Sequence, residues 1–260
     1  MVDRFVVIFT VFIFCTFCGT ALAGEENPGD PGIPFQIVVD RLSILTKDLK
    51  PPFHLFDENA LKNGSEFDPM TFFDILKNIS LKGGKVLDYV YLFQGSAGHP
   101  ILYVRDKGEE PYSNLKVFRE GSGNKDLDRE TMFMKVMEHL EVKDTPEGYF
   151  EYAVFFLKAQ DFYLYKWAER DMRIVCTWDA FERIMNEDSQ VSAEKKSRDA
   201  DINFSPRISL SPEKAEIRLV ICESCHGFYE ERLSVSRVFP HKLVGHEKVE
   251  LVVWKCGVIF

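Results

Sequence analysis

The C-terminal part of the chain contains two runs of β-type sequence, Ala215-Glu-Ile-Arg-Leu-Val-Ile221 and Tyr229-Glu-Glu-Arg-Leu-Ser-Val235, with Cys222-Glu-Ser-Cys-His-Gly227 between them. Both runs are rich in β-branched and other apolar residues, and they match in length. Pairing them leaves about half a dozen residues for the connection, which is typical of a hairpin turn. The sequence therefore predicts an antiparallel hairpin with the cysteine-containing segment at its tip.

The segment at the tip reads C-x-x-C-H, and in these residues it resembles the haem attachment site of c-type cytochromes. The resemblance implies two thioether bonds, from Cys222 and Cys225, and an axial ligand from His226. It covers only this segment of the chain.

Three features weigh against covalent haem at this position. The motif is expected in a hairpin rather than on a helix, and the flanking strands lack a glycine- and proline-rich crevice. No methionine follows Met185, so a sixth ligand would have to be His241, His246 or an upstream residue. We therefore expect no cofactor, with a hairpin-tip disulfide or a pair of thiols beside an incidental histidine, and keep haem c as the alternative. A zinc site ranks third, because structural zinc needs four ligands and no second pair has suitable spacing.

Residues 1–23 have the pattern of a signal peptide. Arg4 precedes an apolar run from Phe5 to Phe17, and Ala21-Leu-Ala23 ends in a cleavage-site pattern. The apolar run is shorter than the ~20 residues that span a bilayer. We expect an exported, soluble protein, periplasmic or extracellular, that begins at Gly24 and has no membrane span after signal removal.

Four cysteines remain after that cleavage, and an even number in an oxidising compartment favours disulfides. We favour a bridge between Cys176 and Cys256, because each lies at the end of a β-type run. A bridge that closes a loop of about 80 residues would stabilise the fold by roughly 4 kcal/mol. Cys222 and Cys225 would then pair with each other or serve another purpose.

Charge and length limit the classes of partner. The chain has a formal net charge of −9, and its lysines are spread rather than clustered. These features argue against nucleic acid and anionic membranes as partners. Removal of 23 residues from 260 leaves 237, enough for a substantial core. An unidentified protein or a small ligand is the expected partner.

The domain organisation follows from changes in composition. Residues 24–34 contain several prolines and glycines and are expected to form a flexible leader. Residues 35–260 are expected to form a single α+β domain, an antiparallel sheet with two or three packed helices and a strand-rich C-terminal part. Within it, residues 186–205 are charged and poor in large apolar residues, which predicts a mobile surface loop.

The expected elements follow from apolar spacing and turn residues. One helix begins at Asp68-Pro69 and has an apolar stripe from Phe72 to Ile79; a second begins at Asp128 and has a stripe from Phe133 to Leu140. A short third helix carries Trp178. Strands are expected at 35–39, 86–93, 101–104, 115–118, 173–177, 215–221, 229–235 and 249–254, with two more within 149–165. The strands at 86–93 and 101–104 would be joined by a long loop over Gly95–Pro100.

A catalytic site is not apparent from residue spacing. Ser96, His99 and Asp88 suggest a hydrolase, but the nucleophile-elbow motif requires glycine two positions before the serine, and Gln94 stands there. The carboxylate clusters lack the spacing of a calcium loop, and we expect no metal site. Three N-x-S motifs begin at Asn63, Asn78 and Asn203, and they would carry no meaning in a bacterial protein.

These observations favour an exported α+β protein that acts by binding or as a structural component rather than as an enzyme. A periplasmic c-type haem protein, for electron transfer or ligand sensing, is the alternative. An exported hydrolase ranks third.

Overall fold

The computed structural model describes residues 31–122, 128–166, 172–187, 202–223 and 226–253. Within them, six α-helices combine with antiparallel strands, which confirms the α+β class and gives more helices than the two or three expected. The helices are α1 (Ile33–Thr46), α2 (Phe72–Ile75), α3 (Leu115–Gly121), α4 (Arg129–Met137), α5 (Pro146–Lys158) and α6 (Trp178–Glu187). The strands are β1 (Ile79–Leu81), β2 (Val86–Gln94), β3 (Ala97–Arg105), β4 (Leu140–Val142), β5 (Tyr165–Lys166), β6 (Met172–Val175), β7 (Arg207–Leu210), β8 (Lys214–Glu223), β9 (Gly227–Ser236) and β10 (Leu243–Val253).

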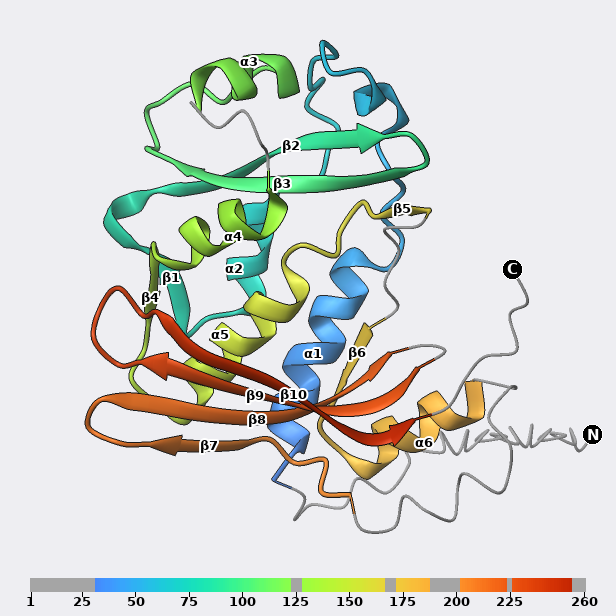
Figure 1. The fold of residues 1–260 in the computed structure, drawn as a ribbon, viewed down its shortest axis with the longest axis vertical. Coiled ribbons are helices and arrows are strands. Elements are labelled where there is room, and N and C mark those ends of the chain that lie inside the picture. The colour runs from blue at the N-terminus through green and yellow to red at the C-terminus, as the bar shows by residue number, and fades with distance from the viewer. Residues whose placement is uncertain (1–30, 123–127, 167–171, 188–201, 224–225, 254–260) are drawn as a thin grey trace, which may run out of the picture.

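The largest sheet is built around the predicted hairpin. Strands β8 and β9 pair in continuous antiparallel register, from Lys214 opposite Ser236 to Glu223 opposite Gly227. β10 pairs with the other edge of β9, while β7 and β6 pair with successive halves of the free edge of β8. Figure 1 shows this sheet crossing the lower part of the molecule, with β10 at its edge. The hairpin expected from the sequence is thus confirmed, and each of its strands is longer than expected.

A second hairpin, β2–β3, forms a separate sheet with the short strand β5 at the upper side of Figure 1. Its strands pair up to Gln94 opposite Ala97, so only Gly95 and Ser96 form the connection. Gly95 has a φ of 60°, the positive value that the first position of a type II′ hairpin turn requires. The long loop predicted over Gly95–Pro100 is therefore wrong, because His99 and Pro100 belong to β3.

Helix α5 occupies the centre of the fold, where two strands were expected within 149–165. The Thr145 side chain accepts the Gly148 N–H at 3.2 Å, and Pro146 takes an early helical position where no N–H is needed. Seven consecutive residues are at most 3% exposed: Tyr149, Phe150, Glu151, Tyr152, Ala153, Val154 and Phe155. A helix buried on every side has no polar face, so its aromatic composition resembled that of strands.

Two further strand predictions are wrong, because both segments form helices in spite of their β-type composition. Residues 35–39 belong to α1, which starts at Ile33 with Pro34 in its first turn and buries Val39 and Leu42. Residues 115–118 belong to α3, where the Asn114 side chain accepts the Val117 N–H at 2.9 Å. Both helices begin with residues that satisfy or omit the first free N–H groups.

The two helices predicted from apolar stripes are present but end early. The first is a single α-helical turn, α2, preceded by a 3-10 turn at Pro69–Thr71, and the second is α4. The last residue of each stripe, Ile79 and Leu140, lies in the two-stranded sheet β1–β4. Apolar spacing identified the buried positions correctly, although the backbone changes from helix to strand between them.

An apolar cluster joins α6 to the tip of the β8–β9 hairpin. Phe204 is 4% exposed, and its ring lies 4.8 Å from that of Phe181 on α6. Phe228, which follows the hairpin turn, contacts both rings. Of the segment 186–205 predicted as a mobile loop, residues 186 and 187 belong to α6 and Phe204 is buried in this cluster, whereas residues 188–201 lie outside the described part. Among the helices that the structure describes, none is long and apolar enough to cross a membrane.

Candidate functional site

A groove with a volume of about 620 Å³ lies between helices α1 and α6 and is also lined by α5 and β6. Figure 1 shows α1 running alongside α5 and β6 through the middle of the molecule. This volume lies within the range that small-molecule sites usually have. The lining residues are Gln36, Val39, Asp40, Leu42, Ser43, Ile44, Thr46, Lys47, Val154, Lys158, Met172, Arg173, Ile174, Ala180, Arg183 and Ile184.

Helix periodicity explains how α1 supplies most of one wall. Gln36, Val39, Asp40, Ser43 and Lys47 follow one another at i, i+3, i+4, i+7 and i+11, so they lie along one side of the helix. This side is mixed: Val39 is buried, whereas Ser43 and Lys47 are exposed. The wall is therefore apolar toward the core and polar toward solvent.

Gln36 fixes the position of this wall. Its side chain is nearly buried, its Oε1 accepts the Cys176 N–H at 2.8 Å, and its Nε2 donates to Asp40 Oδ1 at 2.8 Å. The first bond ties α1 to the residue after β6, and the second orients a carboxylate at the rim of the groove. A buried amide with both ends bonded costs little to bury and holds the two elements in register.

The base of the groove is apolar. Val154 and Ile174 are almost completely buried, and Ala180 from α6 is 4% exposed. Leu42 completes this surface from α1. Burial of an apolar ligand group against this surface would contribute roughly 25 cal/mol of favourable free energy for each Å² removed from water.

The charged side chains of the groove are mostly cationic. Four basic residues line it, Lys47, Lys158, Arg173 and Arg183, against the single acidic residue Asp40. Lys158 is partly buried, and its Nζ lies 2.8 Å from an Asp161 carboxylate oxygen and 2.7 Å from the Met172 carbonyl oxygen. The groove therefore combines an apolar base with a positive rim, in a chain whose net charge is −9.

Two of these cations are available at the rim. Arg183 and Asp40 are only weakly paired, at 3.4 Å, with side chains that are 58% and 43% exposed. An exposed pair of this kind contributes little free energy, so a ligand anion can displace Asp40. Lys47 has no ion-pair or hydrogen-bond partner for its ammonium in the part of the chain that the structure describes.

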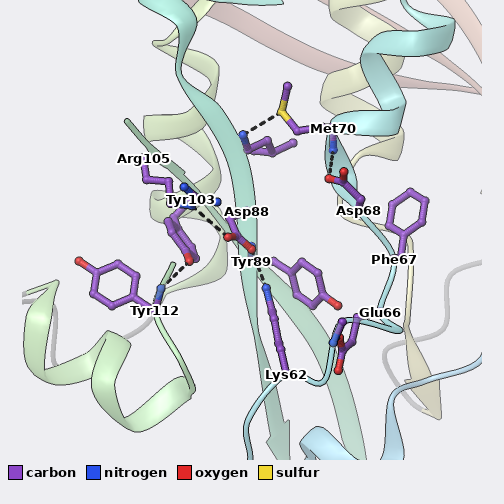
Figure 2. A network of polar contacts seen from close by, with 12 residues as sticks. Lys62, Glu66, Phe67, Asp68, Met70, Asp88, Tyr89, Tyr103, Arg105 and Tyr112 are labelled. Atoms are coloured by element: carbon purple, nitrogen blue, oxygen red, sulfur yellow. Dashed lines mark hydrogen bonds and ion pairs between the residues drawn. The ribbon is translucent and has the colours of Figure 1, made fainter. Parts of the chain in front are cut away.

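A second polar cluster lies on the β2–β3 hairpin and is drawn in Figure 2. Asp88 on β2 accepts from Lys62 Nζ at 2.6 Å through Oδ1 and from Arg105 Nε at 3.2 Å through Oδ2. Oδ1 also accepts the Tyr89 N–H at 2.7 Å. Both carboxylate oxygens are thus occupied, which leaves Asp88 poorly placed to act as a base. The cluster instead fastens the segment around Lys62 to the sheet.

Tyr89 lies beside this cluster, with Lys62 Nζ 3.9 Å from the centre of its ring. Its hydroxyl is buried and has no hydrogen-bond partner among the described residues. Burial raises the pKa of Tyr89 well above the ordinary value, so the hydroxyl stays neutral. Neither tyrosinate chemistry nor a bound ion is supported by this environment.

The described members of the C-x-x-C-H motif differ in burial. Cys222 is 3% exposed and packs in the apolar cluster with Phe181 and Phe228, whereas His226 is exposed. Cys225 lies outside the described residues, so the motif is only partly described, and the 620 Å³ groove is lined by neither Cys222 nor His226. No disulfide joins the described cysteines, and the predicted pairing of Cys176 with Cys256 cannot be followed because Cys256 is also outside them.

The candidate haem ligands downstream of the motif have other partners. His241 Nδ1 lies 3.0 Å from the Ser236 carbonyl oxygen. His246 Nε2 lies 2.6 Å from a carboxylate oxygen of Glu231. Both rings are therefore engaged with protein groups, and haem c stays an untested alternative.

The three residues that suggested a hydrolase do not meet. Asp88 pairs with Tyr103 near the open end of the hairpin, whereas His99 pairs with Leu92 and Ser96 lies in the turn. Leu92 lies four positions after Asp88 along the strand, a distance of roughly 13 Å at the usual rise per residue. Burial, and then the nearby Arg129, lower the pKa of His99 to about 4. The arrangement contains no triad.

The groove residues were not recognised from the sequence. The signal is the spacing of polar residues on one side of α1, but the β-type composition of 35–39 predicts a strand there, and a strand hides an i, i+3, i+4 pattern. Among the described residues, no three His, Cys, Asp or Glu side chains are grouped closely enough to hold a metal ion. The chain matches no protein-family model, no curated protein and no solved structure.

Proposed function

We propose that this chain is an exported, non-catalytic binding protein that holds a small organic anion with an apolar part in the groove between α1 and α6. The observation that carries the proposal is the lining of the groove, whose volume is about 620 Å³: four basic residues and one acidic residue line it together with an apolar base. Small-molecule sites commonly combine an apolar lining with a few polar groups that fix orientation.

The charge of the groove supports an anion rather than a neutral ligand. In a chain with a net charge of −9, four cations line one concave surface, and after Asp40 and Asp161 are set against them an excess of two positive charges is left there. Arg183 would exchange its weak pair with Asp40 for the ligand, and Lys47 would add a second contact. The apolar part of the ligand would lie against Leu42, Val154 and Ile174.

The absence of an assembled acid, base and nucleophile in this groove favours binding over catalysis. Asp40, the acidic residue that lines it, accepts from Gln36 and pairs with Arg183. Lys158 is held by Asp161 and the Met172 carbonyl oxygen. Both groups are therefore engaged with protein partners, which favours a role in fixing charge.

Two fluorescent probes with the same rings test the proposal: anilinonaphthalenesulfonate, which is anionic, and N-phenylnaphthylamine, which lacks the sulfonate. Titration of the purified chain should show tighter binding of the sulfonate, and this preference should weaken as salt is added. The double variant Lys47→Gln/Arg183→Gln should weaken sulfonate binding about 3- to 10-fold, since each exposed ionic contact contributes about 0.2–1 kcal/mol. Binding of the neutral probe should not change.

Two further variants locate the site. Ser43→Trp places a large side chain on the exposed wall of α1 and should weaken both probes. Lys107→Gln removes a cation from an exposed position next to β3, away from the groove, and should leave both unchanged. Equal affinity for the two probes, or equal losses in the Lys107 and Lys47/Arg183 variants, would contradict the proposal.

A further inference from the structure

We propose that Asn63 carries an N-linked glycan, whereas the sequon at Asn78 stays unmodified. The proposal rests on export into a compartment that holds a polyprenyl diphosphate-linked oligosaccharide. In the transfer, the Asn63 side-chain nitrogen forms a bond to the anomeric carbon of the first sugar. The bond from that carbon to the diphosphate oxygen breaks, the polyprenyl diphosphate leaves with the bonding electrons, and the amide nitrogen loses one proton. No redox partner is needed.

Asn63 is the best-presented sequon. Asn63, Gly64 and Ser65 are all exposed. Asn63 Oδ1 accepts the Ser65 N–H at 3.0 Å and the Ser65 hydroxyl at 2.6 Å, so the asparagine and the serine of the motif contact each other directly. Asn63 is exposed, and among the described residues no hydrogen bond engages its Nδ2 atom, which would receive the sugar. A glycan there would extend from the surface, as N-linked glycans must.

The turn that presents Asn63 is held in place rather than loose. One Glu66 oxygen accepts the Asn63 N–H at 2.9 Å, and the other accepts the Gly64 N–H at 2.8 Å. His54 Nε2 lies 2.6 Å from the same carboxylate. Lys62, the preceding residue, is tied to Asp88 in the cluster of Figure 2. The folded protein therefore tolerates a large group at Asn63 without disturbing any of these contacts.

Asn78 has the opposite environment. Its Nδ2 donates to Glu151 Oε1 at 2.6 Å, and its main-chain N–H donates to Glu151 Oε2 at 2.6 Å. Glu151 is 3% exposed on the central helix α5. A sugar on Nδ2 would have to fit beside this buried carboxylate, and displacing the 2.6 Å contact to make room for it would be costly. A folded chain with a glycan at Asn78 is thus disfavoured.

The third sequon is less accessible than the first. Asn203 is exposed, but the middle residue, Phe204, is 4% exposed among aromatic rings. Ser205 is half-buried, and Asn203 Oδ1 accepts the Ser205 N–H at 3.0 Å. We therefore assign the glycan to Asn63.

Expression of the full chain, with its own N-terminus, in a secreting eukaryotic cell line tests the proposal. The secreted protein should lose the mass of a glycan on treatment with peptide N-glycosidase. When the enzyme treatment is carried out in heavy-oxygen water, peptide mass spectrometry should place the heavy-oxygen label on residue 63. Asn63→Gln and Ser65→Ala should abolish the loss of glycan mass, and Ser65→Thr, which keeps a hydroxyl at that position, should retain it.

Ser80→Ala is the matched control, because it destroys the second sequon while leaving the contact between Asn78 and Glu151 intact. Its secreted product should have the same glycan mass as the parent. The proposal is overturned if the secreted chain carries no glycan, if the label falls on residue 78 or 203 and not on 63, or if Ser80→Ala removes a glycan. Retention of the chain inside the cell with an intact N-terminus and no glycan would overturn it as well.

Discussion

The β2–β3 and β8–β9 hairpins have strands of similar length, nine and ten residues, but they are covered differently. β2–β3 is buried on both faces: Leu87 and Tyr89 face the main core, while Val90 and Leu92 face the smaller cluster beneath α3. In β8–β9, only the tip is buried on both faces. Near its base, outward positions such as Arg218 are exposed.

This difference decides which polar groups each hairpin can hold. In β2–β3 the carboxylate of Asp88 is 13% exposed and is paired with two cations that are also largely covered. In β8–β9, Arg232 pairs with Glu230 and Glu247 at a surface where it is 39% exposed. We therefore expect substitution of a charged strand residue to lower stability more in β2–β3 than in β8–β9. Substitution of the turn glycine should lower stability more in β8–β9 than in β2–β3.

The turns should give the largest contrast. Gly227, at the start of β9, has a φ of 123°, and a Cβ there would lie 1.9 Å from the Val252 carbonyl oxygen. Gly95 has a φ of 60°, and a Cβ there would meet nothing within 4 Å. Gly227→Ala should lower the free energy of unfolding by about 3–5 kcal/mol, from backbone strain together with a steric clash. Gly95→Ala should cost only about 1–2 kcal/mol, from strain alone.

Urea denaturation of the two variants measures this contrast. Equal losses would mean that β10 moves away freely from the β9 backbone.

The polar clusters should give the next largest contrast. Asp88→Asn removes the charge that Lys62 and Arg105 share, so two partly buried cations lose their partner; we expect a loss of about 2 kcal/mol in the free energy of unfolding. Arg232→Gln on β9 is the matched substitution at an exposed network and should have little effect. Chemical denaturation checks both. A larger loss in the free energy of unfolding for Arg232→Gln than for Asp88→Asn would contradict the structural role assigned to the Asp88 cluster.

The sequence predicts those parts of the fold that depend on local patterns, and not those that depend on contacts between distant segments. β8 and β9 were placed correctly because matched β-type runs on either side of a short polar turn define a hairpin locally. α5 was missed because Tyr149–Phe155 is buried on every side, and the surroundings that bury it come from distant parts of the chain. The groove was missed for a related reason: it exists only where α1, α5, β6 and α6 meet, and no local pattern contains all four.

Two histidines, one in each of these sheets, should make the stability of the fold depend on pH in opposite directions. His99 lies on β3, where burial, and then Arg129, lower its pKa to about 4 from the ordinary 6.5. Below pH 6.5 the unfolded chain takes up a proton that the folded chain does not, so stability falls as the pH falls from 6.5 to about 4. After allowance for its partial exposure, we expect a loss of about 1–2 kcal/mol over this range. His99→Gln should remove this part of the pH dependence, measured as urea midpoints at a series of pH values.

His246 on β10 should give a smaller effect with the opposite sign. A hydrogen bond to Glu231 raises the pKa of His246, against the opposing effect of burial, and Glu130 raises it further while Lys248 lowers it. The stabilising contribution is therefore fully present below pH 6.5 and is lost as the pH rises through the folded value. The side chain is 40% exposed, so the effect should be reduced by solvent and weaken further in salt. His246→Gln should flatten the alkaline side of the stability profile and leave the acidic side, set by His99, unchanged. Two results would contradict this prediction. One is a contribution of His246 to stability that rises from pH 6.5 upward, and the other is a His246→Gln variant whose stability changes only on the acidic side.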